Sequence, residues 1–150
     1  MMSDERDDLT VQTEEVEHSV ITVADDETLL GIVGDLFPPL FGFDLTPVPE
    51  GALAAETEVG TLFVGVLSDF VVSLELRLPG RHRTTTELLS YLNEENAGSA
   101  FVNFSTLDEH VWVSGNVDGR PLVPMHLARV LTYMFQAASA VLGELLSEEA

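Results

Sequence analysis

The chain has 150 residues and a formal net charge of −20, because 26 aspartates and glutamates stand against six arginines and no lysine. A surface this negative repels phosphate backbones and anionic headgroups, so we expect no nucleic acid and no membrane as a partner. Cysteine is absent, which excludes a disulfide framework, a thiolate metal site and a cysteine nucleophile and fits a cytoplasmic protein.

The N-terminal segment differs from the rest of the chain in composition. Residues 1–18 carry seven carboxylates and a single arginine. Such a segment repels itself and has little apolar surface to bury. We therefore predict an acidic, disordered tail over residues 1–18 and one domain over residues 19–150, and residues 18–23 at their junction can add a short strand.

The first helix is predicted over Asp26–Phe37. Asp25 or Asp26 can cap it, since a carboxylate accepts hydrogen bonds from the free N–H groups of the first turn. The apolar residues that follow recur at helical spacing, and Pro38-Pro39 is expected to end the helix because proline lacks an N–H.

Three strands are predicted next. The alternation of Phe41, Phe43 and Leu45 indicates the first, and residues 51–57 are expected to form a linker or a wide turn. In residues 59–67 apolar side chains occupy both the odd-numbered and the even-numbered positions, which favours a strand covered on both faces. Residues 70–78 then alternate as in a half-buried strand that ends at a Pro-Gly pair.

The remaining pattern predicts a helix, a hairpin and a long helix. Thr84 can cap a helix that runs to Ala97, with Gly98 as a left-handed residue at its end. Two alternating strands follow over residues 100–104 and 110–114, and an apolar helix runs from Pro124 to about residue 146. The predicted class is α+β with the order α-β-β-β-α-β-β-α.

This order resembles the YbjN family, described as a bacterial sensory transduction regulator, and the related chaperones of type III secretion. The resemblance is carried by Leu88–Asn96, which ends in a Leu-Asn-x-x-Asn pattern, by the hairpin over residues 101–114, and by the last helix. It implies a type III secretion chaperone-like fold with a twisted, antiparallel five-stranded sheet flanked by helices, and often a homodimer. It also implies binding of polypeptide segments or a regulatory role without catalysis.

Candidate contact residues are apolar side chains of the two later helices and one tryptophan. Asn93 and Asn96 are a structural signature that either caps the helix end or contacts a partner. Trp112 is either packed in the core or under a helix, or it is an exposed anchor in an interface. The methionines either fill the core or line an adaptable groove. The candidate partner-binding residues are Leu88, Tyr91, Leu92, Trp112, Met125, Met134 and Phe135.

No catalytic or metal-binding pattern is evident. The four histidines lack the spacing of a zinc site, and the cluster Asp108-Glu109-His110 falls in a predicted turn. We expect no enzyme activity, no cofactor and no metal. The expected function is a non-enzymatic, chaperone-like or regulatory domain that presents apolar surface to a partner protein. The alternative is a small-molecule or divalent-ion sensing regulator with a cavity between sheet and helices.

Overall fold

The computed structural model describes residues 19–99 and 101–149, so the predicted acidic tail lies outside the described residues. Within them the elements follow the order α-β-β-β-β-α-β-β-α. They are α2 (Asp26–Phe41), β1 (Thr46–Pro47), β2 (Leu53–Thr57), β3 (Gly60–Leu67), β4 (Val71–Arg77), α3 (Thr86–Ala97), β5 (Asn103–Leu107), β6 (His110–Asp118) and α4 (Pro124–Glu149).

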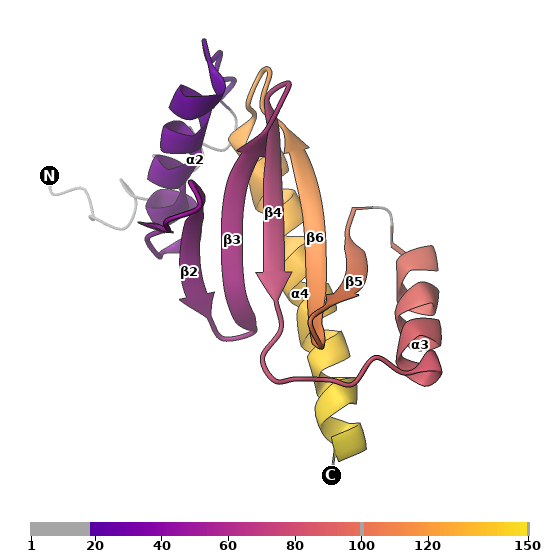
Figure 1. Ribbon diagram of the computed structural model, residues 1–150. Helices are drawn as coiled ribbons and strands as arrows, with labels where there is room; N and C mark the ends of the chain where they lie inside the picture. The colour runs from indigo at the N-terminus through magenta and orange to yellow at the C-terminus, as the bar shows by residue number, and fades with distance from the viewer. Residues whose placement is uncertain (1–18, 100, 150) are drawn as a thin grey trace, which may run out of the picture.

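The described strands form one antiparallel sheet in the order β1-β2-β3-β4-β6-β5. The predicted α+β class is confirmed, but the sheet has six strands rather than five. Helices α4 and α2 lie against β6 and β3 and contact each other, so both cover the same face of the sheet (Figure 1). Helix α3 lies against the edge strand β5, and no described helix covers the opposite face, which we call the open face.

Alternation along the strands separates the core from the open face. Val72, Leu74 and Leu76 of β4 are fully buried under the helices, while Glu75 and Arg77 point to the open face. The predicted alternation of this strand is therefore confirmed, whereas the prediction that β3 is covered on both faces is wrong. The neighbouring strands add Leu62, Val64, Val111, Val113 and Val117 to the core.

Helix α2 corrects the predicted first helix. It begins as expected, with Asp25 as its N-cap, but it continues through Pro38 and Pro39 to Phe41. Each proline removes one N–H, yet its carbonyl still accepts, and the backbone N–H of Gly42 donates to the oxygen of Pro38 at 2.9 Å. Gly42 then turns the chain with a φ of 80°, a left-handed conformation that glycine adopts without strain.

The longer helix displaces the predicted first strand. Phe41 is helical, Phe43 lies in the connection, and the short strand β1 begins only at Thr46. The predicted linker over residues 51–57 contains strand β2. This additional strand raises the number of strands in the sheet from the predicted five to six. Its residues Ala54 and Ala55 have low strand propensity, so the pairing with β3 decides the structure here.

Three smaller features at the helix ends and the N-terminus also differ from prediction. Thr85 rather than Thr84 caps α3, because its hydroxyl accepts from the backbone nitrogen of Leu88 at 3.1 Å. Gly98 follows the helix with a φ of −90°, so it is not left-handed. Of the predicted strand over residues 18–23, the described residues show a single bridge between Ile21 and Leu122.

Helix α4 extends three residues beyond its predicted end. Among the described residues it has the length and apolar composition of a helix that could cross a membrane. Its apolar composition also follows from its place in the fold, since Leu127, Leu131 and Met134 are fully buried against the sheet. Gly115 of β6 makes room for this helix, because a Cβ there would lie 2.8 Å from Cγ1 of Val130.

Candidate functional site: an aromatic groove beside an open strand edge

A groove of about 740 Å³ lies where the end of α2, the turn between β2 and β3, and α4 come together. We call it the aromatic groove. It is lined by Phe41, Phe43, Glu56, Thr57, Glu58, Val59, Phe135 and Ser139.

Three packed phenylalanine rings hold one wall of the aromatic groove in place. Phe37 is fully buried, and its ring centroid lies 4.9 Å from that of Phe41 and 5.6 Å from that of Phe43. Phe41 and Phe43 are themselves half-buried and 6.2 Å apart. A buried ring therefore supports two rings that keep part of their surface for a ligand.

The groove exists because the chain between the end of α2 and β1 does not run alongside the whole length of β2. β1 pairs with β2 only at Leu53 and Ala54. On that side residues 55–57 of β2 therefore have no neighbouring strand, and the gap is the aromatic groove. An open strand edge of this kind offers backbone N–H and C=O groups to another chain.

The turn that forms the opposite rim is fixed by its own hydrogen bonds. The hydroxyl of Thr57 donates to the carbonyl oxygen of Gly60 at 2.8 Å and accepts from the backbone nitrogen of Val59 at 3.3 Å. Gly60 has a φ of 143° and lies against the backbone of Arg77, where no Cβ would fit. The rim is therefore preformed.

Two carboxylates mark the rim. Glu56 and Glu58 are exposed, and Oε1 of Glu56 accepts a hydrogen bond from the hydroxyl of Thr61 at 2.9 Å. No arginine is among the residues that line the groove. The site thus combines apolar walls, an unpaired strand edge and a negative rim, which suits binding of an extended segment better than chemistry on a small substrate.

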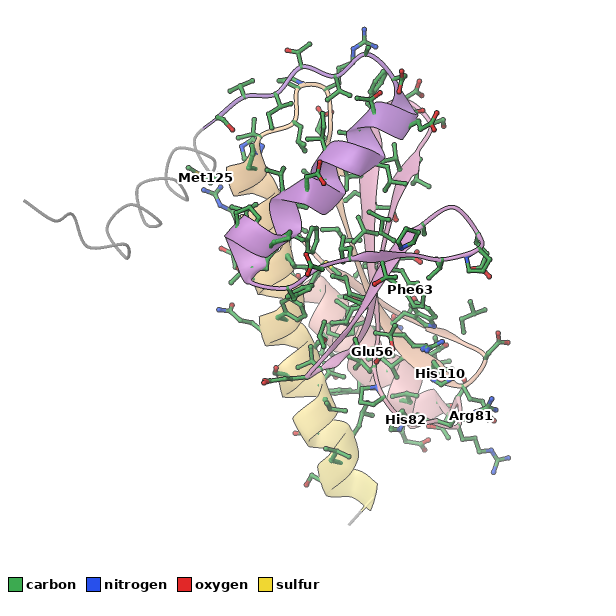
Figure 2. All side chains as sticks on the ribbon, turned by 90° about the vertical axis from the view of Figure 1, so that its left-hand side faces the viewer. Glu56, Phe63, Arg81, His82, His110 and Met125 are labelled. Atoms are coloured by element: carbon green, nitrogen blue, oxygen red, sulfur yellow. The ribbon has the colours of Figure 1, made fainter. Side chains whose placement is uncertain are left out.

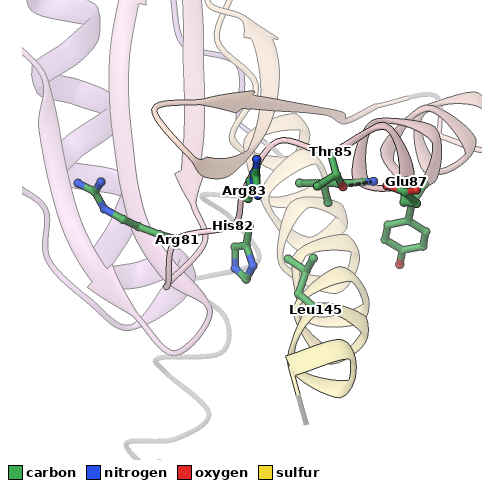
Figure 3. Close-up of a pocket in the computed structure, with 8 residues that line it drawn as sticks. Arg81, His82, Arg83, Thr85, Glu87 and Leu145 are labelled. Carbon is green, nitrogen blue, oxygen red and sulfur yellow. Dashed lines mark hydrogen bonds between the residues drawn. The ribbon is translucent and has the colours of Figure 1, made fainter.

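A second, smaller hollow of about 250 Å³ lies between the β4–α3 connection, the start of α3 and the end of α4 (Figure 3). Leu88 and Tyr91, two of the predicted contact residues, line it together with three basic residues, Arg81, His82 and Arg83. The arginine side chains do not converge. Arg81 extends away from the helices (Figure 3) and lies 3.9 Å from a carboxylate oxygen of Glu109, with both side chains largely exposed.

Trp112 lies on the open face rather than under a helix. Its ring packs 5.8 Å from that of Phe63, and the guanidinium of Arg77 stacks over both rings at 5.6 and 5.9 Å. Its Nε1 atom is buried without a hydrogen-bond partner. Figure 2 shows Phe63 and His110 on the side of the sheet that faces away from α4.

The structure does not bring the other predicted contact residues together. Leu92 and Met134 are buried in the core, and Met125 lies in a hollow of about 360 Å³ on the outer side of α4. Of the predicted set, only Phe135 lines the aromatic groove.

Sequence reasoning missed most of the groove residues. The pattern places Phe41 and Phe43 on a strand, Glu56 in a linker and Val59 at the start of the next strand, and it assigns Glu58 to no element. The signal that could have found them is an aromatic pair followed by a turn flanked by carboxylates. That signal is informative only once α2 is known to continue through its two prolines.

The two signature asparagines have different surroundings. Asn96 forms two hydrogen bonds with the backbone of Phe104 in β5, a contact within the fold that differs from the predicted cap of the helix end. Asn93 is exposed on α3. Within residues 19–99 and 101–149, no group of three or more histidines and carboxylates could hold a metal ion, so the ion-sensing alternative gains no support.

Comparisons with known proteins agree with a peptide-binding fold. The sequence profile of TY-Chap1, described as "T3SS (YopN, CesT) and YbjN peptide-binding chaperone 1", matches residues 27–148. No curated protein matches the sequence.

Three solved structures share the fold at low sequence identity. YbjN from E. coli, a candidate transcription regulator, has a TM-score of 0.66 and 14% identity, with 87% of this chain and 97% of that chain covered. The Yersinia pestis type III secretion chaperone SycH, in complex with a stable fragment of YscM2, has a TM-score of 0.56 and 15% identity over 77% and 98% of the two chains. The ExsC–ExsE complex gives a TM-score of 0.57 and 14% identity over 75% and 86%.

These matches confirm the resemblance that the Leu-Asn-x-x-Asn pattern and the element order carry. The chain belongs to the family of peptide-binding chaperones that includes YbjN and the type III secretion chaperones.

Proposed function

We propose that this protein binds an extended segment of a partner protein in the aromatic groove, as a chaperone-like or regulatory domain of the cytoplasm with no chemical step. The observation that carries the proposal is the aromatic groove beside the unpaired edge of residues 55–57. The description of the family as peptide-binding and the complex of SycH with a YscM2 fragment support it.

The groove offers a segment two kinds of interaction. The free edge of β2 can form main-chain hydrogen bonds with an added strand, which give affinity without requiring a sequence. Side chains on one side of that strand would enter the space between Phe43 and Phe135. Burial of one aliphatic side chain there contributes roughly 1.5–3 kcal/mol.

A binding measurement with an uncharged peptide tests this proposal. We expect a labelled eight-residue peptide of alternating valine and serine to bind with a saturable change in fluorescence anisotropy, and an all-serine peptide not to bind. Ser139→Trp fills the groove from α4 and should abolish binding. Ala140→Trp, at an exposed position outside the groove, should leave it intact. No saturable binding to the wild-type protein, or equal binding by both variants, would contradict the proposal.

We further propose that two copies associate through a surface around Phe101 and Tyr133. These two exposed rings stack with centroids 5.1 Å apart and an interplanar angle of 6°. Two hollows flank the pair, and none of their lining residues is a carboxylate. Each chain carries a charge of −20. The electrostatic repulsion between two copies is smallest when the surfaces that meet contain no carboxylate.

Sedimentation equilibrium tests the dimer. We expect the wild-type protein to sediment as a dimer and Tyr133→Glu to sediment as a monomer with an unchanged circular dichroism spectrum. Leu67→Glu introduces the same charge at another exposed apolar residue and should leave the dimer intact. A monomeric wild-type protein would overturn this part of the proposal.

A further inference from the structure

The directions of the side chains along β2 restrict what an added strand can carry. Ala55 pairs with Leu62, which is fully buried on the helix-covered face, so Ala55 and Thr57 point to that face. Glu56 pairs with Thr61, which in turn pairs with Arg77 on the open face. The edge of β2 therefore has apolar surroundings on the helix-covered face and the carboxylate of Glu56 on the open face.

A strand added at this edge would repeat that division. Residues directly opposite each other in neighbouring strands point to the same face. Side chains opposite Ala55 and Thr57 would enter the aromatic groove, where Phe43 and Phe135 lie. The side chain between them would point to the open face beside Glu56, at the position that Figure 2 labels.

Glu56 lies beside that middle position, in a hollow that it shares with Glu58, Arg77 and His110. Glu58 in the adjoining turn adds a second exposed carboxylate. Arg77 lies in the same cross-strand row as Glu56, but its guanidinium stacks over Phe63 and Trp112. A lysine or arginine opposite Glu56 would therefore be attracted, and a glutamate would be repelled.

We propose that the aromatic groove selects extended segments in which apolar residues alternate with lysine or arginine. This inference rests on the proposed function and specifies its partner: the apolar side chains fill the groove, and the basic side chain meets Glu56. The negative charge of the whole chain attracts any basic segment, whereas Glu56 makes the preference depend on alternation.

Three labelled eight-residue peptides test the selectivity. In the first, valine and lysine alternate; in the second, valine and glutamate alternate; in the third, four valines precede four lysines. We expect the first peptide to bind about tenfold more tightly than the second at low ionic strength, and the difference to shrink in high salt. The third peptide has the charge of the first without its alternation. The net charge of the chain attracts both peptides equally, so the third should bind more weakly than the first by the part that the groove and Glu56 contribute.

Two variants matched in net charge separate a local effect from the overall field. Glu56→Lys should reduce the preference for the lysine peptide over the glutamate peptide, because it replaces the local attraction by a local repulsion. Glu94→Lys changes the net charge equally at an exposed position on α3 and should leave the preference unchanged.

Equal binding of the first and third peptides, or the same effect of both variants, would overturn the inference but leave peptide binding standing. Failure of the uncharged valine-serine peptide and of all three charged peptides to bind would overturn both the inference and the proposed function.

Discussion

Asn96 binds the backbone of Phe104 with both ends of its side-chain amide. Its Nδ2 donates to the carbonyl oxygen of Phe104 at 2.9 Å, and its Oδ1 accepts from the amide nitrogen of Phe104 at 2.6 Å. A neighbouring strand would make the same two bonds. Asn96 therefore covers part of the edge of β5 and fixes α3 to the sheet.

Replacement of Asn96 should destabilise the protein while replacement of Asn93 should not. Asn96→Ala leaves a partly buried N–H and C=O of Phe104 without partners, which we expect to cost about 1–3 kcal/mol in the free energy of unfolding. Asn93→Ala removes an exposed side chain and should stay within about 0.5 kcal/mol of the wild type. Urea denaturation measures both values, and equal losses would contradict this assignment.

Close packing of α4 on β6 leads to a second prediction. A Cβ at Gly115 would lie 2.8 Å from Cγ1 of Val130, 3.2 Å from the sulfur of Met134 and 3.3 Å from the carbonyl oxygen of Phe101. Gly115→Ala should therefore lower the free energy of unfolding by about 1–3 kcal/mol.

Gly65 of β3 provides the control for Gly115. No atom lies within 4 Å of a Cβ built at this position. Gly65→Ala should raise stability slightly, by about 0.5 kcal/mol, because alanine loses less backbone freedom on folding. Thermal unfolding should give midpoints on opposite sides of the wild-type value, and a stabilising Gly115→Ala would refute the packing argument.

The elements with strong local patterns were predictable from the sequence. The buried face of β4 and helix α4 follow from alternation and helical spacing. The hairpin was also predicted, but its first strand lies at Asn103–Leu107 rather than residues 100–104, and its second strand continues past residue 114 to Asp118. Pro38 and Pro39 misled the prediction because a local rule ends the helix there, whereas burial of Phe37 and the left-handed turn at Gly42 carry it on to Phe41. β2 was missed because Ala54 and Ala55 carry no local strand signal.

The site was predictable only in part, for a related reason. Phe135 lies in a helix whose position the pattern predicts, and it does line the groove. Phe43 and Glu56 are brought to the same groove by the length of α2 and by the pairing of β2. Neither feature can be read from residue spacing, because both depend on contacts with residues distant in the sequence.

The stacking of Arg77 predicts a spectroscopic effect. Trp112 is the single tryptophan of the chain, so its fluorescence reports on the open face alone. Arg77→Ala removes the cation over two rings, which should cost about 0.5–1 kcal/mol and shift the emission maximum to longer wavelength as water reaches the indole. Arg129→Ala removes an exposed arginine of α4 and should leave the emission unchanged, and a red shift in both variants would count against the stacking.

The N-cap of α2 predicts a dependence of stability on pH. Oδ1 of Asp25 accepts a hydrogen bond from the backbone nitrogen of Thr28 at 2.7 Å. Hydrogen bonds from the backbone and side chain of Thr28 lower the pKa of Asp25 below its usual value of 3.8, against a smaller opposing effect of desolvation. Because the pKa is lower in the folded than in the unfolded state, the capping contribution is complete above pH 3.8 and is lost as the pH falls toward the folded pKa.

Asp25→Asn isolates this contribution, because asparagine caps a helix about as well as aspartate and does not titrate in this range. Above pH 5 we expect the variant and the wild type to differ by a constant amount in melting temperature. Between pH 4 and pH 2.5 the wild type should lose more than the variant, since the other carboxylates titrate in both proteins and cancel in the difference. Parallel curves over the whole range would show that the ionised carboxylate of Asp25 does not stabilise the start of α2.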